Sequence, residues 1–203
     1  MGEGVSFSIY ATGPAGGRLG YLRRGPCIVP TPCFMPCASL ATVRALPPHE
    51  LWSLGYRLVV VNALHLRLRP GHHVVHSLGG LHSFMSWPGL IATDSGGFQA
   101  FSLAELDDAQ PQALQFTSPI DGQRLSVTPE QMAETQQKLG ADLIVALDVC
   151  APYPVDREHA RRAVDITLHW AQRAKAAQRR EDQMLFGVVQ GQNGSWALAR
   201  RGI

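Results

Sequence analysis

Four short apolar runs, each followed by a polar side chain, constrain most strongly what this chain can fold into. They are apolar almost throughout rather than alternating, which is typical of strands buried on both faces of a parallel sheet. The runs and the residues that follow them are 58–61 with Asn62, 90–93 with Asp94, 143–147 with Asp148, and 184–189 with Gln190. A weaker run, 33–35 between Pro32 and Pro36, is predicted to be one more strand.

Helices are expected between these runs. Thr128 has the features of a helix N-cap, with Pro129 at the first helical position and Gln131 placed to complete a capping box. The alternation of strands and helices predicts an α/β domain with a parallel sheet. The expected helices are 47–54, 128–139 and 157–180.

The first thirty residues follow a different pattern. They are rich in glycine and proline and hold the short pieces 5–10, 19–22 and 27–29, which predict a small antiparallel arrangement. We therefore divide the chain into an N-terminal β segment, 1–32, and a β/α domain, 33–203. At 203 residues the chain is at the lower limit for a (β/α)₈ barrel, which is typically about 250 residues long.

Composition excludes several classes of protein. A hydrophobic content of 45% is too high for a disordered chain, and no apolar run is long enough to cross a membrane. The N-terminus lacks a signal-peptide pattern, so we expect a cytoplasmic protein. The net charge of +2 neither requires nor excludes nucleic acid. Cys33 and Cys37 are interpreted as buried or partly buried thiols rather than as half of a metal site.

The polar strand-end residues predict a site. Side chains at the carboxyl ends of parallel strands converge on one rim. After Asp94 and Ser95, Gly96 and Gly97 let a ligand approach the backbone closely, and Phe98 offers an aromatic face to a planar ring. The same residues also suit a tight strand-to-helix turn with a core phenylalanine. Phosphate binding is disfavoured, because Asp94 would repel the anion and no P-loop lysine follows.

These residues carry a family resemblance. The chain resembles the tRNA-guanine transglycosylases, the queuine tRNA-ribosyltransferase family, over nearly its whole length and in the same order. The matching motifs are 34–36, 62–71, 79–82, 94–99, 120–122, 128–130, 139–142, 148–154 and 187–191.

The resemblance implies a (β/α)₈ TIM barrel that exchanges the wobble guanine of certain tRNAs for a 7-deazaguanine, the queuosine precursor. An aspartate nucleophile would attack the ribose and release guanine, which makes two easier steps out of one. Asp94 matches the family's acid/base, Ser95, Gly96 and Gly97 line the base pocket, and Phe98 holds the stacking position. The matched base-binding residues are Asp148 and Gln190, with weaker assignments for Cys150 and Gly191.

The resemblance covers about the first five barrel strands. The nucleophilic aspartate, a basic tRNA-binding segment and a structural zinc site of three cysteines and a histidine have no counterpart in these 203 residues. We therefore expect an incomplete barrel without a cofactor, together with tRNA and a guanine-type base as partners. A homodimer or a complementing subunit is also expected. The alternative is a non-catalytic relative that binds tRNA or the base.

Three departures from the family pattern lie near the expected pocket, and they suggest relaxed constraint. They are Ala63-Leu64, Val149 and Gln192. The bacterial form of the loop after Asp148 is matched by Cys150 and the residues that follow, which favours the aminomethyl precursor as substrate. For Cys150 itself, packing and a pocket role remain equally open. Four arginine pairs are candidates for phosphate contacts or for solvated faces: 23–24, 161–162, 179–180 and 200–201.

Overall fold

A four-stranded parallel sheet forms the centre of the molecule. The computed structural model describes residues 4–97, 111–151 and 154–190. The sheet has the order β4-β5-β8-β9, and every pair in it is parallel. All four predicted runs are confirmed as strands, although the last two stop earlier than expected. The strands are β4 (Leu58–Asn62), β5 (Leu90–Asp94), β8 (Leu143–Val145) and β9 (Met184–Phe186).

The prediction of a strand at 33–35 is wrong. Two residues after this segment, the chain pairs with β4 through a single parallel bridge between Cys37 and Val60. There the Val60 amide donates to the Pro36 carbonyl over 3.0 Å, and the Ala38 amide donates to Val60 over 2.7 Å. Prolines at both ends of 33–35 have no N–H to donate, which explains why pairing starts only after Pro36. Within the described residues the sheet stays open, and no closed barrel is seen.

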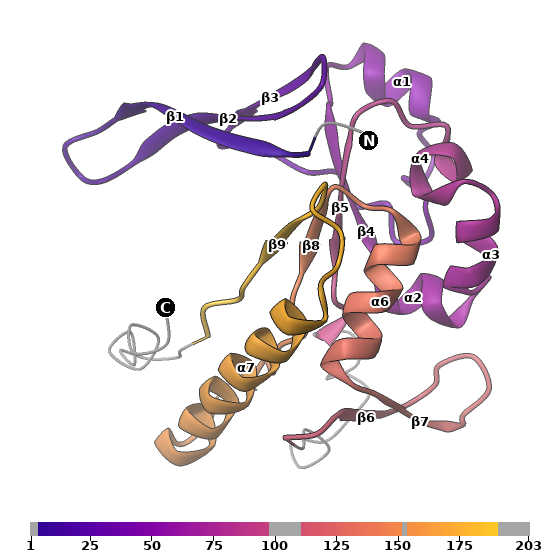
Figure 1. Cartoon of the computed structure of the whole chain (residues 1–203), viewed down its shortest axis with the longest axis vertical. Coiled ribbons are helices and arrows are strands. Elements are labelled where there is room, and N and C mark those ends of the chain that lie inside the picture. Colours follow the sequence, from indigo (N-terminus) through magenta and orange to yellow (C-terminus); the bar gives the residue numbers. More distant parts are fainter. Residues whose placement is uncertain (1–3, 98–110, 152–153, 191–203) are drawn as a thin grey trace.

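The N-terminal antiparallel segment is confirmed as a three-stranded sheet of β1 (Ser6–Thr12), β2 (Arg18–Arg24) and β3 (Cys27–Thr31). It lies at the amino-terminal end of the parallel sheet and projects away from it (Figure 1). Its buried residues Leu22 and Val29 form one cluster with Leu58, Leu90 and Leu143 from the parallel strands. The small sheet therefore covers the end of the parallel sheet opposite the polar strand ends.

Helices pack against the parallel sheet and contribute buried side chains to the core. The three predicted helices are confirmed as α1 (Pro48–Ser53), α6 (Pro129–Leu139) and α7 (Arg157–Ala177), which ends three residues earlier than expected. Their main buried side chains include Leu51, Met132 and Trp170. No helix in the described part of the chain is long and apolar enough to cross a membrane. Elements not predicted from the sequence are α2 (Ala63–Leu68), α3 (His72–Ser77), α4 (Gly80–Met85), and the hairpin β6 (Leu114–Thr117) with β7 (Arg124–Val127).

The start of α6 confirms the capping box. The Gln131 amide donates to Thr128 Oγ1 over 3.2 Å, and the Thr128 amide donates to Gln131 Oε1 over 3.0 Å. Gly140 ends the helix with a φ of 74°, in the left-handed region that favours glycine.

We predict that Thr128→Ala lowers the free energy of unfolding by about 1 kcal/mol, because a helix-end N–H loses its acceptor. Urea unfolding measures this change. Thr128→Ser keeps the hydroxyl, and a similar loss in that variant would contradict the capping role.

The cysteines differ from the expectation. Cys33 and Cys37 are exposed, because they belong to the irregular segment ahead of β4 rather than to a buried strand. Cys27 and Cys150 are half-buried, and all four thiols are free. Across the described ranges, no group of three His, Cys, Asp or Glu side chains could hold a metal ion.

Candidate functional site

The parallel register brings the first two strand-end residues together. Asn62 on β4 is paired directly with Asp94 on β5. Asn62 Nδ2 donates to Asp94 Oδ2 over 3.4 Å, while Asn62 Oδ1 accepts from the His65 amide over 2.8 Å and caps α2. One buried amide therefore holds the Asp94 carboxylate and the following helix in place at once.

The turn after β5 requires its two glycines. Asp94 Oδ1 accepts from the Gly96 amide over 3.1 Å, which folds the chain back on the carboxylate. Gly96 has a φ of +71°, and a Cβ at this position would overlap the Leu64 side chain. A Cβ on Gly97 would lie 2.7 Å from both the carbonyl oxygen and the Oδ1 of Asp148. The glycines let the β5 turn pack directly on the end of the neighbouring strand.

Asp148 links the ends of three strands. Its Oδ2 accepts a hydrogen bond of 2.6 Å from Gln190 Nε2, and its Oδ1 lies 3.5 Å from the donor Ser95 Oγ. Burial raises the pKa of Asp148 above the usual value for an aspartate, while the hydrogen bonds from Gln190 and Ser95 oppose this rise. The structure thus places Asp94, Ser95, Gly96, Gly97, Asp148 and Gln190 at or after the carboxyl ends of β5, β8 and β9.

The remaining predicted site residues have different outcomes. Phe98 and Gly191 lie outside the described residues. Cys150 is half-buried, with its Sγ 4.0 Å from the Ala151 carbonyl. Burial, followed by the negative charge of Asp148, raises the pKa of the Cys150 thiol, so it stays protonated at neutral pH and is a poor nucleophile.

One supporting residue was missed from the sequence. Thr167, a buried residue of α7, accepts from the Val149 amide over 3.0 Å and so holds the loop that directly follows Asp148. The only signal in the sequence is a polar residue within the apolar stripe of the helix. A threonine hydroxyl in that position also suits an internal helix hydrogen bond, so the pattern alone does not reveal its partner.

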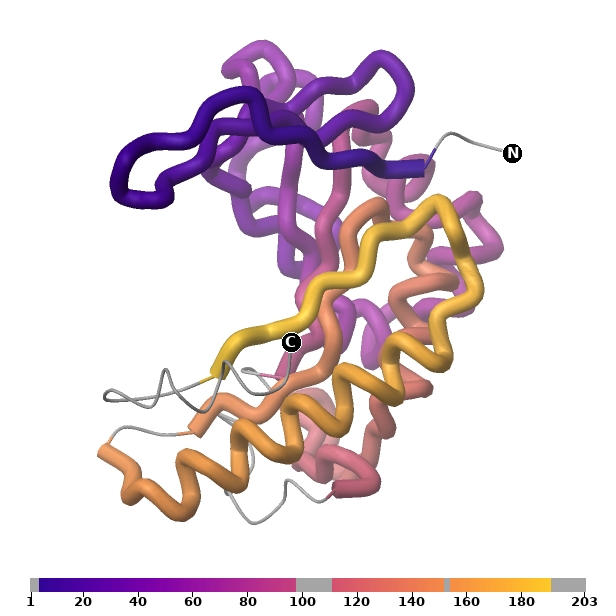
Figure 2. The backbone as a smooth tube through the Cα atoms, turned by 60° about the vertical axis from the view of Figure 1, so that its left-hand side comes forward, coloured from indigo at the N-terminus to yellow at the C-terminus, as the bar shows by residue number. Residues whose placement is uncertain are grey.

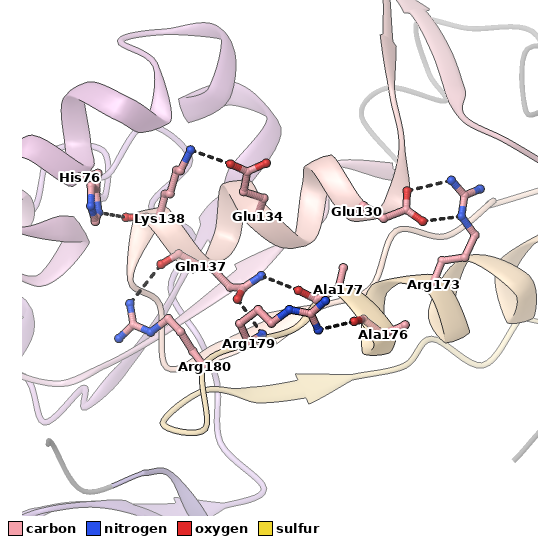
Figure 3. A pocket seen from close by; sticks show the side chains of 10 residues that line it. All are labelled: His76, Glu130, Glu134, Gln137, Lys138, Arg173, Ala176, Ala177, Arg179 and Arg180. Carbon is pink, nitrogen blue, oxygen red and sulfur yellow. Dashed lines mark hydrogen bonds and ion pairs between the residues drawn. The ribbon is translucent and has the colours of Figure 1, made fainter.

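A groove of about 700 Å³ lies between α6 and α7, and none of the strand-end residues lines it (Figure 3). Two ion pairs join four of its charged side chains. Both Glu130 oxygens accept from Arg173, at 2.6 and 2.8 Å, and Lys138 donates to Glu134 over 2.6 Å. Gln137 donates to the Ala177 carbonyl over 3.3 Å. The Glu130–Arg173 and Gln137–Ala177 contacts join the two helices, so we interpret the groove as a helix-packing feature and place the candidate site at the strand ends.

The fold and the site define a class of protein. Carboxylates and amides gathered at the carboxyl ends of parallel strands are the usual arrangement of binding sites in β/α enzymes. The Asp148–Gln190 pair supplies both acceptors and donors, and Asp94 adds a second carboxylate at the end of the adjacent strand β5. Such a set suits a flat, polar ligand with N–H groups and a carbonyl oxygen.

Comparison with known proteins identifies the family. A family model described as queuine tRNA-ribosyltransferase matches residues 14–196. A curated protein of that name from Symbiobacterium thermophilum is 49% identical over 175 residues, covering 86% of this chain and 44% of the relative. A relative of the same name from Pelotomaculum thermopropionicum is 47% identical over 188 residues, covering 92% of this chain and 51% of the relative. The chain belongs to the queuine tRNA-ribosyltransferase family, and it spans about half the length of the curated relatives it matches.

Proposed function

We propose that the strand-end site binds guanine and 7-deazaguanine bases, as the base-recognition part of a tRNA-guanine transglycosylase in queuosine modification. The observation that carries this proposal is the Asp148–Gln190 pair beside Asp94, in a chain of this family. The names of the curated relatives support the same activity. A cytoplasmic location accords with a protein that modifies tRNA.

The donor and acceptor pattern of guanine fits the pair. The Asp148 carboxylate accepts from the ring N1–H and the exocyclic amine, which lie on one edge of the base. Gln190 has two amide hydrogens, so one can stay on Asp148 while the other donates to the O6 carbonyl. Gly97 leaves space against Asp148 that a side chain would fill. Adenine offers a lone pair at N1 and an amine at C6, so it presents the wrong partner at both positions.

Asp94 is proposed as the acid/base that moves protons on the leaving and entering bases. It stands at the end of β5, held by Asn62 Nδ2 and by the Gly96 amide. A carboxylate in that place can transfer a proton when the glycosidic bond breaks and take it back when the new bond forms. We propose no described residue as the nucleophile that attacks the ribose. In the second candidate function, a non-catalytic relative, the same site binds the base without exchange.

Equilibrium dialysis with radiolabelled guanine tests the base site, with adenine as the matched control. We expect guanine to bind and adenine not to bind. Equal retention of both bases would contradict the proposed recognition. Labelled guanine exchange into tRNA then distinguishes the two candidate functions, and Asp94→Asn is expected to abolish any exchange observed.

The pH dependence of guanine binding follows from the raised pKa of Asp148. The ionised carboxylate accepts from both N1–H and the amine, while in the protonated form one oxygen carries a hydrogen and faces a donor of the base. Guanine affinity is therefore constant at neutral pH and falls as the pH drops through the Asp148 pKa. Because burial raises that pKa, the fall begins at a higher pH than for an ordinary aspartate. Dialysis between pH 4 and pH 8 measures the profile, and unchanged binding across this range would contradict the role of Asp148.

A further inference from the structure

The parallel sheet has its shortest ladder between the two strands that carry the candidate carboxylates. β5 and β8 share two register pairs, of which Thr93 with Ile144 is the last, whereas β4 and β5 share five and β8 and β9 share three. Asp94 and Asp148 therefore follow two strands that are paired with each other over a short distance only. The spacing of the two strand ends depends on contacts outside this ladder.

Gln136 supplies such contacts from α6, the helix beside β8 (Figure 1 and Figure 2). The residue is 1% exposed. Its Oε1 accepts from the Thr93 hydroxyl on β5 over 2.9 Å and from the Val145 amide on β8 over 3.1 Å. Its Nε2 donates to the Val145 carbonyl over 3.0 Å. One buried side chain thus binds β5 one residue before Asp94 and β8 three residues before Asp148.

The bonds to Val145 lie at the edge of β8 that faces β5. The Ala146 amide donates to the Phe186 carbonyl on β9 over 2.9 Å, and successive amides of a strand point to opposite edges. The Val145 N–H and C=O therefore point toward β5, at the level where the ladder between the two strands ends. The Gln136 amide has a donor and an acceptor, as a peptide group does, and it bonds to both groups of Val145.

The main chain of the same residue contacts the approach to the third strand. The Gln136 carbonyl accepts from Gln183 Nε2 over 3.3 Å, and Gln183 directly precedes β9. β9 leads to Gln190, the hydrogen-bond partner of Asp148. A buried amide costs free energy unless its hydrogen bonds are satisfied, whereas an apolar side chain of similar length has no such requirement. Core packing alone therefore does not require a glutamine at this position.

We propose that Gln136 is a positioning residue of the base site, which fixes the separation of Asp94 and Asp148 by joining the strands that carry them. This inference rests on the proposed function, because it assigns a support to the same site. Thr93 and Asp94 are adjacent in β5, so their side chains point to opposite faces of the sheet. Gln136 thus acts from the face away from the base. A base held at Asp148 then meets Asp94 at one defined distance, as proton transfer requires.

Guanine dialysis on variants of the full chain tests the positioning role. Gln136→Met keeps the length of the side chain and removes the amide, while Thr93→Val removes the hydroxyl that β5 offers to Gln136. We expect guanine affinity to fall about 10-fold in both, the loss expected for one misplaced hydrogen bond to the base. Thr93→Ser keeps the hydroxyl and should bind guanine as the parent chain does. The double variant should lose no more affinity than Gln136→Met, because both changes break the same contact.

The matched control is Met132→Ala. Met132 lies one turn earlier on α6, is also 1% exposed and packs in the apolar core. Its truncation should lower the melting temperature and leave guanine affinity at the parent value, when dialysis is done at a temperature at which all variants are folded. Equal losses of affinity in Met132→Ala and Gln136→Met would overturn the proposal. Equal affinities of Thr93→Val and Thr93→Ser would also overturn it, and this pair decides the question if Gln136→Met does not fold.

Amide hydrogen exchange separates this inference from the base site. The Gly96 and Val149 amides follow the ends of β5 and β8, and each is hydrogen-bonded to a group other than Gln136. We expect both to exchange about 10-fold faster in Thr93→Val than in Thr93→Ser, because the strand ends open more often. Faster exchange in a chain that binds no guanine would support the positioning role and contradict the base site. Equal exchange in the two variants would overturn the positioning role, whether or not guanine binds.

Discussion

Replacing Asp148 with asparagine is expected to lower the affinity of the chain for guanine about 100-fold, or about 2.7 kcal/mol. The carboxylate presents acceptors to N1–H and to the exocyclic amine of the base, whereas an asparagine amide turns one of these acceptors into a donor. One donor of the base is then left facing another donor in a half-buried site. The same change disturbs the 2.6 Å hydrogen bond from Gln190 Nε2, which now needs the remaining amide oxygen.

The matched control for this experiment is Asp156→Asn. Asp156 is also an aspartate in the segment after β8, but its side chain is 61% exposed and caps α7. Asparagine is as good an N-cap as aspartate, so guanine affinity and stability should both stay close to those of the parent chain. Equilibrium dialysis with labelled guanine gives the two affinities, and thermal unfolding confirms that both variants fold. A parent-like affinity in Asp148→Asn would remove Asp148 from the proposed site.

Replacing Asp142 with alanine is expected to lower the free energy of unfolding by about 3 kcal/mol. Its side chain is 1% exposed and joins three elements. Oδ2 accepts from the Ile91 amide on β5 over 2.7 Å and lies 3.1 Å from His82 Nε2 on α4, while Oδ1 pairs with Arg24 on β2. Without the carboxylate, the buried Ile91 amide loses its acceptor and Arg24 loses its ion pair.

Asp182→Ala is the control for this effect. Asp182 also pairs with an arginine, at 2.6 Å from Arg180, but the two side chains are 28% and 38% exposed. A solvated pair of this kind contributes about 1 kcal/mol at most. For a domain of this size, a loss of 1 kcal/mol in the free energy of unfolding lowers the melting temperature by about 2–4 °C. The Asp142→Ala variant should therefore melt about 6–12 °C lower than the parent chain. Equal losses of unfolding free energy in the two variants would show that burial of the Asp142 carboxylate adds nothing to the stability of the chain.

The sequence predicted the candidate site because strand phase and side-chain chemistry are both local. Uninterrupted apolar runs indicate strands buried on both faces, and parallel strands place their following residues on one rim. Asp94, Asp148 and Gln190 could therefore be assigned to one rim before any contact was known. In the structure Asp148 contacts Gln190 and Ser95, the residue that follows Asp94. The capping box at Thr128 was predictable for the same reason, since it needs only residues three apart.

The sequence pattern did not predict the short elements. The helices α2, α3 and α4 have six residues each, which is less than two turns and too few to establish a helical period. The segment at 33–35 has the apolar residues of a strand, but the flanking Pro32 and Pro36 have no N–H to donate, and the structure has no strand there. Cys33 and Cys37 are exposed as a consequence, against the expectation from their hydrophobic character.

The sequence by itself determined the family, the parallel sheet expected for a β/α domain, and the residue types available for binding a guanine-like base. The tertiary structure alone decided how these groups are held. Asn62 reaches Asp94, Thr167 holds the loop after Asp148, and Asp142 fastens the N-terminal sheet to the parallel sheet. These contacts join residues 18 to 118 positions apart, so they depend on how the strands and helices pack and leave no periodic signal along the chain.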